Sequence, residues 1–250
     1  FSGLEAIQYN RNRKNPDLHF FEFGKTYHKT SQNNISNYKE INHLNIFLIG
    51  NRYSESWIKN SPEHYSIYFL KSLLNNLFVN SGIEQKDILH QKSENDLFTT
   101  SLDIFAGKKK IAEYGILNSS IQKSFDIDED VFYADILTDV WMDAVKSAKH
   151  KISEAPKFPE VRRDISMLIN KNISYADIEK LAFETERKLL ISVNLFDVYK
   201  GDNIEEGKIS YAISFILRDD EKTLTDKQID GVMEKLMNVF ESKLGAQIRK

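Results

Sequence analysis

The chain of 250 residues contains no cysteine, which excludes disulfide bonds and thiolate metal sites. No apolar run approaches the roughly twenty residues of a membrane-spanning helix, and no signal-peptide pattern opens the sequence. We therefore expect no membrane contact and a cytoplasmic location. The first residue is phenylalanine rather than methionine, so we expect the sequence to be a piece of a longer protein.

The sequence also lacks the short motifs that mark many catalytic and cofactor sites. It has no glycine-rich phosphate loop, no G-x-S-x-G nucleophile elbow and no pair of histidines at helical spacing. The six histidines are scattered along the chain, so we predict no metal site. Adjacent carboxylates such as Asp219 and Asp220 fall in turns, where solvated charge is the commoner role. We predict no catalytic residue and no cofactor in this chain.

A basic surplus, which many nucleic-acid-binding proteins have, is missing as well. The chain has 34 Lys and Arg against 37 Asp and Glu, for a formal net charge of −3. Residues 156–250 are equally balanced, with sixteen basic and seventeen acidic side chains. Non-specific RNA binding depends on neutralising phosphates with basic side chains. If this half binds RNA, we expect a local patch that contacts exposed bases, with weak affinity.

Length and composition are those of a globular protein with two modest domains. The apolar fraction is 41% and the charged fraction is 28%, both ordinary values. The segment from Lys146 to Pro156 is charged and poor in apolar residues, which is typical of a domain boundary. We therefore predict one domain at 1–150 and a second at 156–250.

In the first half, apolar runs predict an antiparallel sheet with flanking helices. The predicted strands are 18–27, 44–49, 101–105, 110–117 and 131–137. The polar segment 31–42 predicts a surface loop. Ser61 followed by Pro62 predicts the first residues of a helix, and an apolar stripe that continues to Gly82 predicts its buried face.

The second half predicts the order strand, helix, strand, strand, helix, strand. The predicted strands are 164–170, 195–199, 211–217 and 246–248. Ser174 with Asp177, and Thr225 with Gln228, have the spacing of capping boxes that begin helices. This order is the ferredoxin-like split β-α-β motif. Alternation within the strands predicts one helix-covered face and one open face with small or polar side chains.

Several segments resemble one known family. In the second half they are PKFPEVRRDIS at 156–166, LFDVYKG at 195–201, EGK at 206–208 and RDDEKTLTD at 218–226. These are similar, in the same order, to the anticodon-binding domain that ends the β chain of bacterial phenylalanyl-tRNA synthetase. The preceding domain of that chain, an inactive copy of a catalytic fold, is similar to YNRNRKNPDLHFFEFGKTY at 9–27.

The resemblance implies an α+β fold: a class II synthetase-like antiparallel sheet with flanking helices, followed by a ferredoxin-like β-α-β-β-α-β domain. It also implies part of a phenylalanine–tRNA ligase, which joins phenylalanine to tRNA(Phe) using ATP and Mg²⁺. In this family the active site lies in a separate catalytic α subunit, and the expected assembly is an α2β2 heterotetramer.

The distribution of arginine bears on whether the first domain is active. Class II synthetases hold ATP phosphates with arginines, whose planar donors suit that task. No arginine occurs between Tyr53 and Val161. We therefore expect the first domain to be a non-catalytic scaffold for the α subunit, and the second to bind the anticodon loop of tRNA(Phe).

The RNA-binding candidates follow from this resemblance and from the chemistry of base recognition. Single-stranded bases are read by stacking on aromatic or guanidinium planes and by hydrogen bonds to their edges. The candidates at the strand ends of the second domain are Arg162, Arg163, Phe196, Asp197, Tyr199, Arg218, Asp219 and Thr223. Two alternatives stay open. Phe196 and Tyr199 belong to the core if their strand has the other parity, and Arg163 with Asp164 could form a local ion pair.

A rival hypothesis treats both domains as a non-catalytic protein-interaction scaffold, with a ligand-sensing ferredoxin-like module. The near-neutral charge favours this rival. The ordered motifs of the second half favour the synthetase. An independent enzyme has no supporting set of residues.

Overall fold

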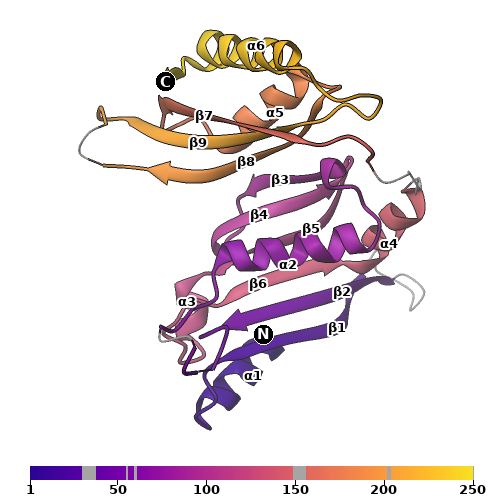
Figure 1. Cartoon of the computed structure of the whole chain (residues 1–250). Coiled ribbons are helices and arrows are strands. Elements are labelled where there is room, and N and C mark those ends of the chain that lie inside the picture. The colour runs from indigo at the N-terminus through magenta and orange to yellow at the C-terminus, as the bar shows by residue number, and fades with distance from the viewer. Residues whose placement is uncertain (30–37, 55, 59–60, 149–155, 202–203, 250) are drawn as a thin grey trace. The chain divides into compact units, whose positions relative to one another are not determined.

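The computed structural model describes residues 1–29, 38–54, 56–58, 61–148, 156–201 and 204–249 (Figure 1). The chain forms two compact units, Phe1–Lys151 and Ile152–Lys250. Most of the predicted boundary segment, residues 149–155, lies outside the described residues. Within the described part of the chain, no helix is long and apolar enough to cross a membrane.

The first unit is built on a six-stranded antiparallel sheet with the strand order β1-β2-β6-β5-β4-β3 (Figure 1). Its strands are β1 (Leu18–Lys29), β2 (Tyr38–Ile49), β3 (Ile88–Ser93), β4 (Phe98–Ala106), β5 (Lys109–Leu117) and β6 (Phe132–Leu137). The helices are α1 (Ser2–Arg11), α2 (Ile67–Asn80), α3 (Ser119–Lys123) and α4 (Thr138–Ser147), with a 3-10 turn at Gln85–Asp87. The predicted antiparallel sheet with flanking helices is confirmed.

Alternation along the strands decides which side of this sheet is covered. Leu44, Ile46 and Leu48 of β2 point to one face, where they share a core with α2 and with apolar residues of α4. Phe47 points to the other face and packs in a second cluster with Leu4 of α1. Helices α2 and α4 therefore pack on one face of the sheet. Helix α1 packs on one end of the opposite face.

Two predictions for this unit are wrong. The predicted loop 31–42 overlaps β2, which begins at Tyr38; its residues 31–37 lie outside the described part of the chain. Cross-strand pairing with β1 overrides the polar composition there, since Lys25 lies opposite Asn42. Helix α2 begins at Ile67 with Ser66 as its N-cap, not at Ser61. Residues 63–65 instead bond to 50–52, as in the Arg52 N–H to Glu63 carbonyl bond of 2.8 Å.

A half-buried histidine connects α2 to the sheet. His90 of β3 lies with Nε2 2.9 Å from the amide oxygen of Asn75 on α2. Its Nδ1 lies 3.1 Å from the hydroxyl of Tyr114 on β5. Nε2–H therefore donates to Asn75 and Nδ1 accepts from Tyr114, which fixes a neutral tautomer. Burial lowers the pKa of His90 to about 4, because the charged ring would lose its hydration.

The second unit is a four-stranded antiparallel sheet with the order β10-β7-β9-β8. Its strands are β7 (Val161–Asn170), β8 (Leu190–Tyr199), β9 (Lys208–Leu217) and β10 (Gln247–Arg249), and its helices are α5 (Tyr175–Thr185) and α6 (Asp226–Leu244). The predicted β-α-β-β-α-β order is confirmed. Both helices contribute to one core with the sheet (Figure 1), in which the rings of Phe215 on β9 and Phe240 on α6 lie 6.0 Å apart.

The helix boundaries of this unit follow local rules. Both predicted capping boxes are present, at Ser174 with Asp177 and at Thr225 with Gln228. Gly245 ends α6 with a φ of 61°, a left-handed conformation that glycine adopts without strain. The strands β7 and β8 begin earlier than predicted, because pairing with β9 extends them.

We expect the half-buried His90 to make the first unit less stable as the pH falls. The unfolded histidine takes up a proton below its usual pKa near 6.5, whereas the folded one does so only near 4. Between these values the free energy of unfolding should therefore fall by about 1.4 kcal/mol per pH unit from this group. Urea unfolding at pH 7, 6 and 5 measures the slope. The His90→Gln variant should lose this part of it; equal slopes in both proteins would contradict the assignment.

Candidate nucleic-acid interface

The face of the second sheet that carries no helix has a floor of small side chains. Ser166 of β7 lies opposite Ala212 of β9, and Asp164 lies opposite Ser214. These residues alternate with Ile165, Met167 and Ile213, which point into the helix-covered core. Small side chains leave room for a flat group to approach the sheet. The predicted open face is confirmed along the central strands.

A β-bulge in β8 places two consecutive residues, Phe196 and Asp197, on the same face. Leu195 lies opposite Ile213 and Asp197 opposite Ala212, so Phe196 is an extra residue between two consecutive pairs. The bulge sends both Phe196 and Asp197 toward the open face. There the Arg162 guanidinium carbon lies 5.1 Å from the centre of the Phe196 ring, and Phe196 is 48% exposed. The alternative that Phe196 belongs to the core is wrong.

Arg162 is held in place by its neighbour on the same strand. Its Nε and one Nη donate to the two carboxylate oxygens of Asp164, at 2.8 and 3.2 Å. This two-bonded geometry keeps the guanidinium plane fixed beside the aromatic ring. The ion pair of this strand therefore joins Asp164 to Arg162 rather than to Arg163. Arg163 is half-buried and donates to the Arg162 carbonyl at 3.1 Å.

Asp197 and Tyr199 follow Phe196 at the C-terminal end of β8. Tyr199 is opposite Ser210 and Asp197 opposite Ala212, so both point to the open face with Phe196. Tyr199 is exposed, and a side chain on Gly201 would come within 2.2 Å of its hydroxyl. The glycine thus lets the tyrosine ring lie close to the backbone. The alternative that Tyr199 belongs to the core is wrong as well.

The remaining candidates follow the end of β9 and play different parts. Arg218 donates to Glu160 at 2.6 Å and to Asp220 at 2.9 Å, so its charge is used within the unit. Asp219 is buried and accepts a hydrogen bond from the Glu221 N–H at 3.0 Å. Thr223 is exposed. Of this group, Thr223 is free to meet a ligand without losing an internal bond.

The first unit has an unusual open face of its own. Six residues lie opposite one another across all six strands, and we call them the polar row: Glu22, Asn45, Asp135, Glu113, Asp103 and Gln91. The row points away from α2, because Asn45 lies between Leu44 and Ile46, which face that helix. Sequence reasoning missed it, since it depends on strand register.

One lysine and one histidine bond to carboxylates of the polar row. Lys110 bridges Asp103 and Glu113 with N–O distances of 2.8 and 2.6 Å. Burial opposes its charge, but its bonds to both carboxylates raise the pKa of Lys110 overall. His43 bonds to Asp135 at 2.8 Å; burial raises the pKa of Asp135 although this bond opposes the rise. The row thus holds four carboxylates and Lys110 pairs with two of them, so the face is acidic.

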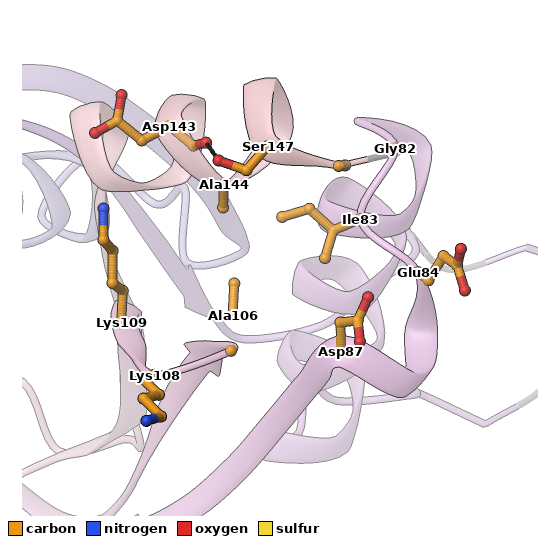
Figure 2. Close-up of a pocket in the computed structure, with 12 residues that line it drawn as sticks. Gly82, Ile83, Glu84, Asp87, Ala106, Lys108, Lys109, Asp143, Ala144 and Ser147 are labelled. Carbon is orange, nitrogen blue, oxygen red and sulfur yellow. Dashed lines mark hydrogen bonds between the residues drawn. The ribbon is translucent and has the colours of Figure 1, made fainter. Parts of the chain in front are cut away.

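A cavity of about 390 Å³ lies away from this face, between the ends of α2 and α4 and the β4–β5 turn (Figure 2). Ile83, Ala106 and Ala144 point into it, whereas Lys108 and Glu84 extend from its rim. A catalytic pocket needs polar groups that converge on one point, and the interior offers mainly apolar side chains. Among the described residues, no group of three or more His, Asp or Glu is placed to hold a metal ion.

Family profiles match both units. The profile described as "Ferredoxin-fold anticodon binding domain" matches residues 156–249. The profile described as "Phenylalanyl tRNA synthetase beta chain CLM domain" matches residues 1–137. The chain belongs to the phenylalanyl-tRNA synthetase beta chain family. The resemblance seen in the sequence motifs is therefore confirmed, together with the ferredoxin-like fold of the second unit.

Individual relatives agree with the family assignment. The phenylalanine–tRNA ligase beta subunit of Bacteroides fragilis is 42% identical over 255 residues, which cover 100% of this chain and 31% of the relative. That of Porphyromonas gingivalis is 38% identical over 257 residues, with the same coverage. The chain thus spans about a third of the length of these synthetase subunits.

Solved structures of other synthetases are more distant. Pyrrolysyl-tRNA synthetase from Desulfitobacterium hafniense is similar with a TM-score of 0.44 and 13% identity, over 60% of this chain and 49% of that one.

We expect Asp219 to stabilise the synthetase fragment whatever its part in RNA binding. Replacing Asp219 by Ala leaves the Glu221 N–H without its acceptor, which should lower the free energy of unfolding by about 1–3 kcal/mol. The Asp219→Asn variant keeps an acceptor oxygen and should lose clearly less. Urea unfolding followed by circular dichroism measures both. Equal losses for Ala and Asn would show that the carboxylate charge, not the hydrogen bond, stabilises the turn.

Proposed function

We propose that the full-length protein is the β subunit of a cytoplasmic phenylalanine–tRNA ligase, and that these two units serve it without carrying out its chemistry. The second unit binds the anticodon loop of tRNA(Phe). The first unit supports the catalytic α subunit, which uses ATP and Mg²⁺, within an α2β2 heterotetramer. Membership of the β chain family supports this assignment.

The pair of Arg162 and Phe196 is the observation that carries the anticodon proposal. An exposed aromatic ring and a guanidinium plane on a helix-free sheet are the groups that unstacked bases contact. The two groups lie 5.1 Å apart, and the bonds to Asp164 fix the position of the guanidinium group without RNA. Little ordering of these side chains is therefore needed on binding. Tyr199 and Asp197 on the same face can add a second stacking surface and an acceptor for base amino groups.

Charge supports recognition of bases rather than of phosphates. Arg162 already forms an ion pair with Asp164. Arg218 forms ion pairs with both Glu160 and Asp220. These two arginines are therefore less available to neutralise phosphates, so binding should depend weakly on salt. Stacking and edge contacts then supply most of the affinity, and the isolated fragment binds weakly.

The polar row supports a scaffold role for the first unit. ATP carries several negative charges, and class II active sites meet them with arginine. Here the open face presents Glu22, Asp103, Glu113 and Asp135 instead, with Lys110 already engaged by two of them. These carboxylates carry the same sign of charge as the phosphates of ATP and therefore oppose binding of a polyphosphate. The residues present do not fit ATP, so we assign ATP and Mg²⁺ to the α subunit.

Replacing Phe196 should weaken binding of the tRNA(Phe) anticodon stem-loop. Loss of one stacked base costs about 1–3 kcal/mol, so the dissociation constant of the Phe196→Ala variant should rise roughly 5- to 150-fold. Fluorescence anisotropy with a labelled stem-loop measures it. The matched control is Phe183→Ala on α5, which removes an exposed phenylalanine from the helix side. Equal affinities for the wild type and Phe196→Ala, or no response to altered anticodon bases, would contradict the proposal.

The 250-residue chain should form no phenylalanyl-adenylate by itself. With phenylalanine, ATP and Mg²⁺, exchange of label between pyrophosphate and ATP should stay at the level without protein, because the polar row repels the phosphates. Purified α2β2 enzyme is the positive control. Exchange catalysed by the chain alone would overturn the assignment of the first unit as non-catalytic.

A further inference from the structure

A chain of hydrogen bonds links three strands on the open face of the first sheet. The carboxylate of Asp135 on β6 lies 2.8 Å from Nδ1 of His43 on β2. Nε2 of the same ring lies 2.9 Å from the hydroxyl oxygen of Thr26 on β1. An ionised carboxylate can only accept, so in the neutral ring Nδ1–H donates to it and Nε2 accepts from the threonine. The order of hydroxyl, imidazole and carboxylate is that of an activated nucleophile.

The register of β1 leaves the threonine accessible and gives room beside it. Thr26 follows Glu22 of the polar row by four positions, so both point to the open face, and Thr26 is exposed. Gly24 lies between them and opposite His43. A Cβ atom on Gly24 would meet no atom within 4 Å in the described part of the chain beyond its own neighbours in sequence. A small acyl group therefore has space next to the hydroxyl and the imidazole.

Two basic side chains lie beyond Thr26 on the same face. Nε2 of His28 lies 3.2 Å from the Thr26 hydroxyl oxygen. Because the hydroxyl proton is directed at His43, this second bond is donated by His28. Lys39 lies opposite His28 on β2 and is exposed, so it adds a positive charge there. Glu22 of the polar row is six residues before His28 on β1, roughly 20 Å away along the strand. An anionic leaving group is therefore better accepted here than over the polar row.

We propose that Thr26 is a modification site that takes an acyl group from a small acyl phosphate. The threonine oxygen forms a bond to the carbonyl carbon, and the bond from that carbon to the phosphate oxygen breaks. Nε2 of His43 accepts the hydroxyl proton and then releases it to solvent, while inorganic phosphate leaves beside His28 and Lys39. Asp135 is a positioning residue, which holds His43 in the tautomer that can accept the proton. The product is one ester of Thr26 per chain, so the proposal is separate from the ligase chemistry and from the anticodon function.

Peptide mass spectrometry of the assembled full-length enzyme, treated with acetyl phosphate, tests the proposal. We expect an acetyl group on Thr26. The internal control is Thr223, an exposed threonine that bonds to no histidine among the described residues. A positioned base accelerates such a step by about 10²- to 10⁴-fold, so Thr26 should react at least about 100-fold faster than Thr223. The His43→Gln variant should slow the acetylation of Thr26 to the rate of Thr223.

The Asp135→Asn variant separates positioning from folding. Its amide can donate to Nδ1 of His43, which leaves the ring proton on Nε2, so the ring can no longer accept the proton of Thr26. Acetylation of Thr26 should slow strongly, whereas the thermal unfolding midpoint should stay near that of the wild type. A lower midpoint with unchanged acetylation would overturn the positioning role. Equal rates at Thr26 and Thr223 in the wild type, or a Thr26 rate that His43→Gln leaves unchanged, would overturn the modification site itself.

Discussion

The alternation of side chains along antiparallel strands is the constraint on which both units depend. Each strand sends every second residue under a helix and the others to the opposite face. Helices α5 and α6 cover one face of the second sheet, and α2 with α4 covers one face of the first. The parts of the opposite faces that no helix covers contribute less to folding, so their residues can serve other demands. This division leaves each unit an open face whose side chains need not pack in its core.

The two uncovered faces show what those demands are. The second sheet presents Arg162 and Phe196 over a floor of serine and alanine, a surface suited to flat, unpaired bases. The first presents a line of carboxylates with one shared lysine, a surface that opposes nucleotide phosphates. The two units thus differ in the chemistry of their open faces.

Much of the fold could be predicted from local signals. Capping boxes at Ser174 and Thr225 and the glycine at 245 gave the helix ends of the second unit, because these signals act within a few residues. The early part of β2 could not be predicted. Its polar residues are held by pairing with β1, a contact between segments whose register no local pattern shows. The predicted start of α2 was wrong for the same reason, since residues 63–65 bond to 50–52.

The candidate interface shows the same limit at the level of single side chains. Motifs gave the residues, but the orientation of Asp197 depends on an extra residue that interrupts the period of two. The polar row could not be found at all, because it exists only when six strands are placed in register. Residue types can therefore be read from the sequence, whereas their alignment across strands requires the fold.

The bulge in β8 determines what a one-residue deletion in this strand would change. Leu195 and Val198 lie opposite Ile213 and Tyr211, two residues of the core side, although three positions separate them. Loss of the Asp197 codon would restore regular pleating and leave Phe196 on the open face, opposite Ala212. A one-residue deletion would thus remove the carboxylate from the open face while keeping the aromatic ring there.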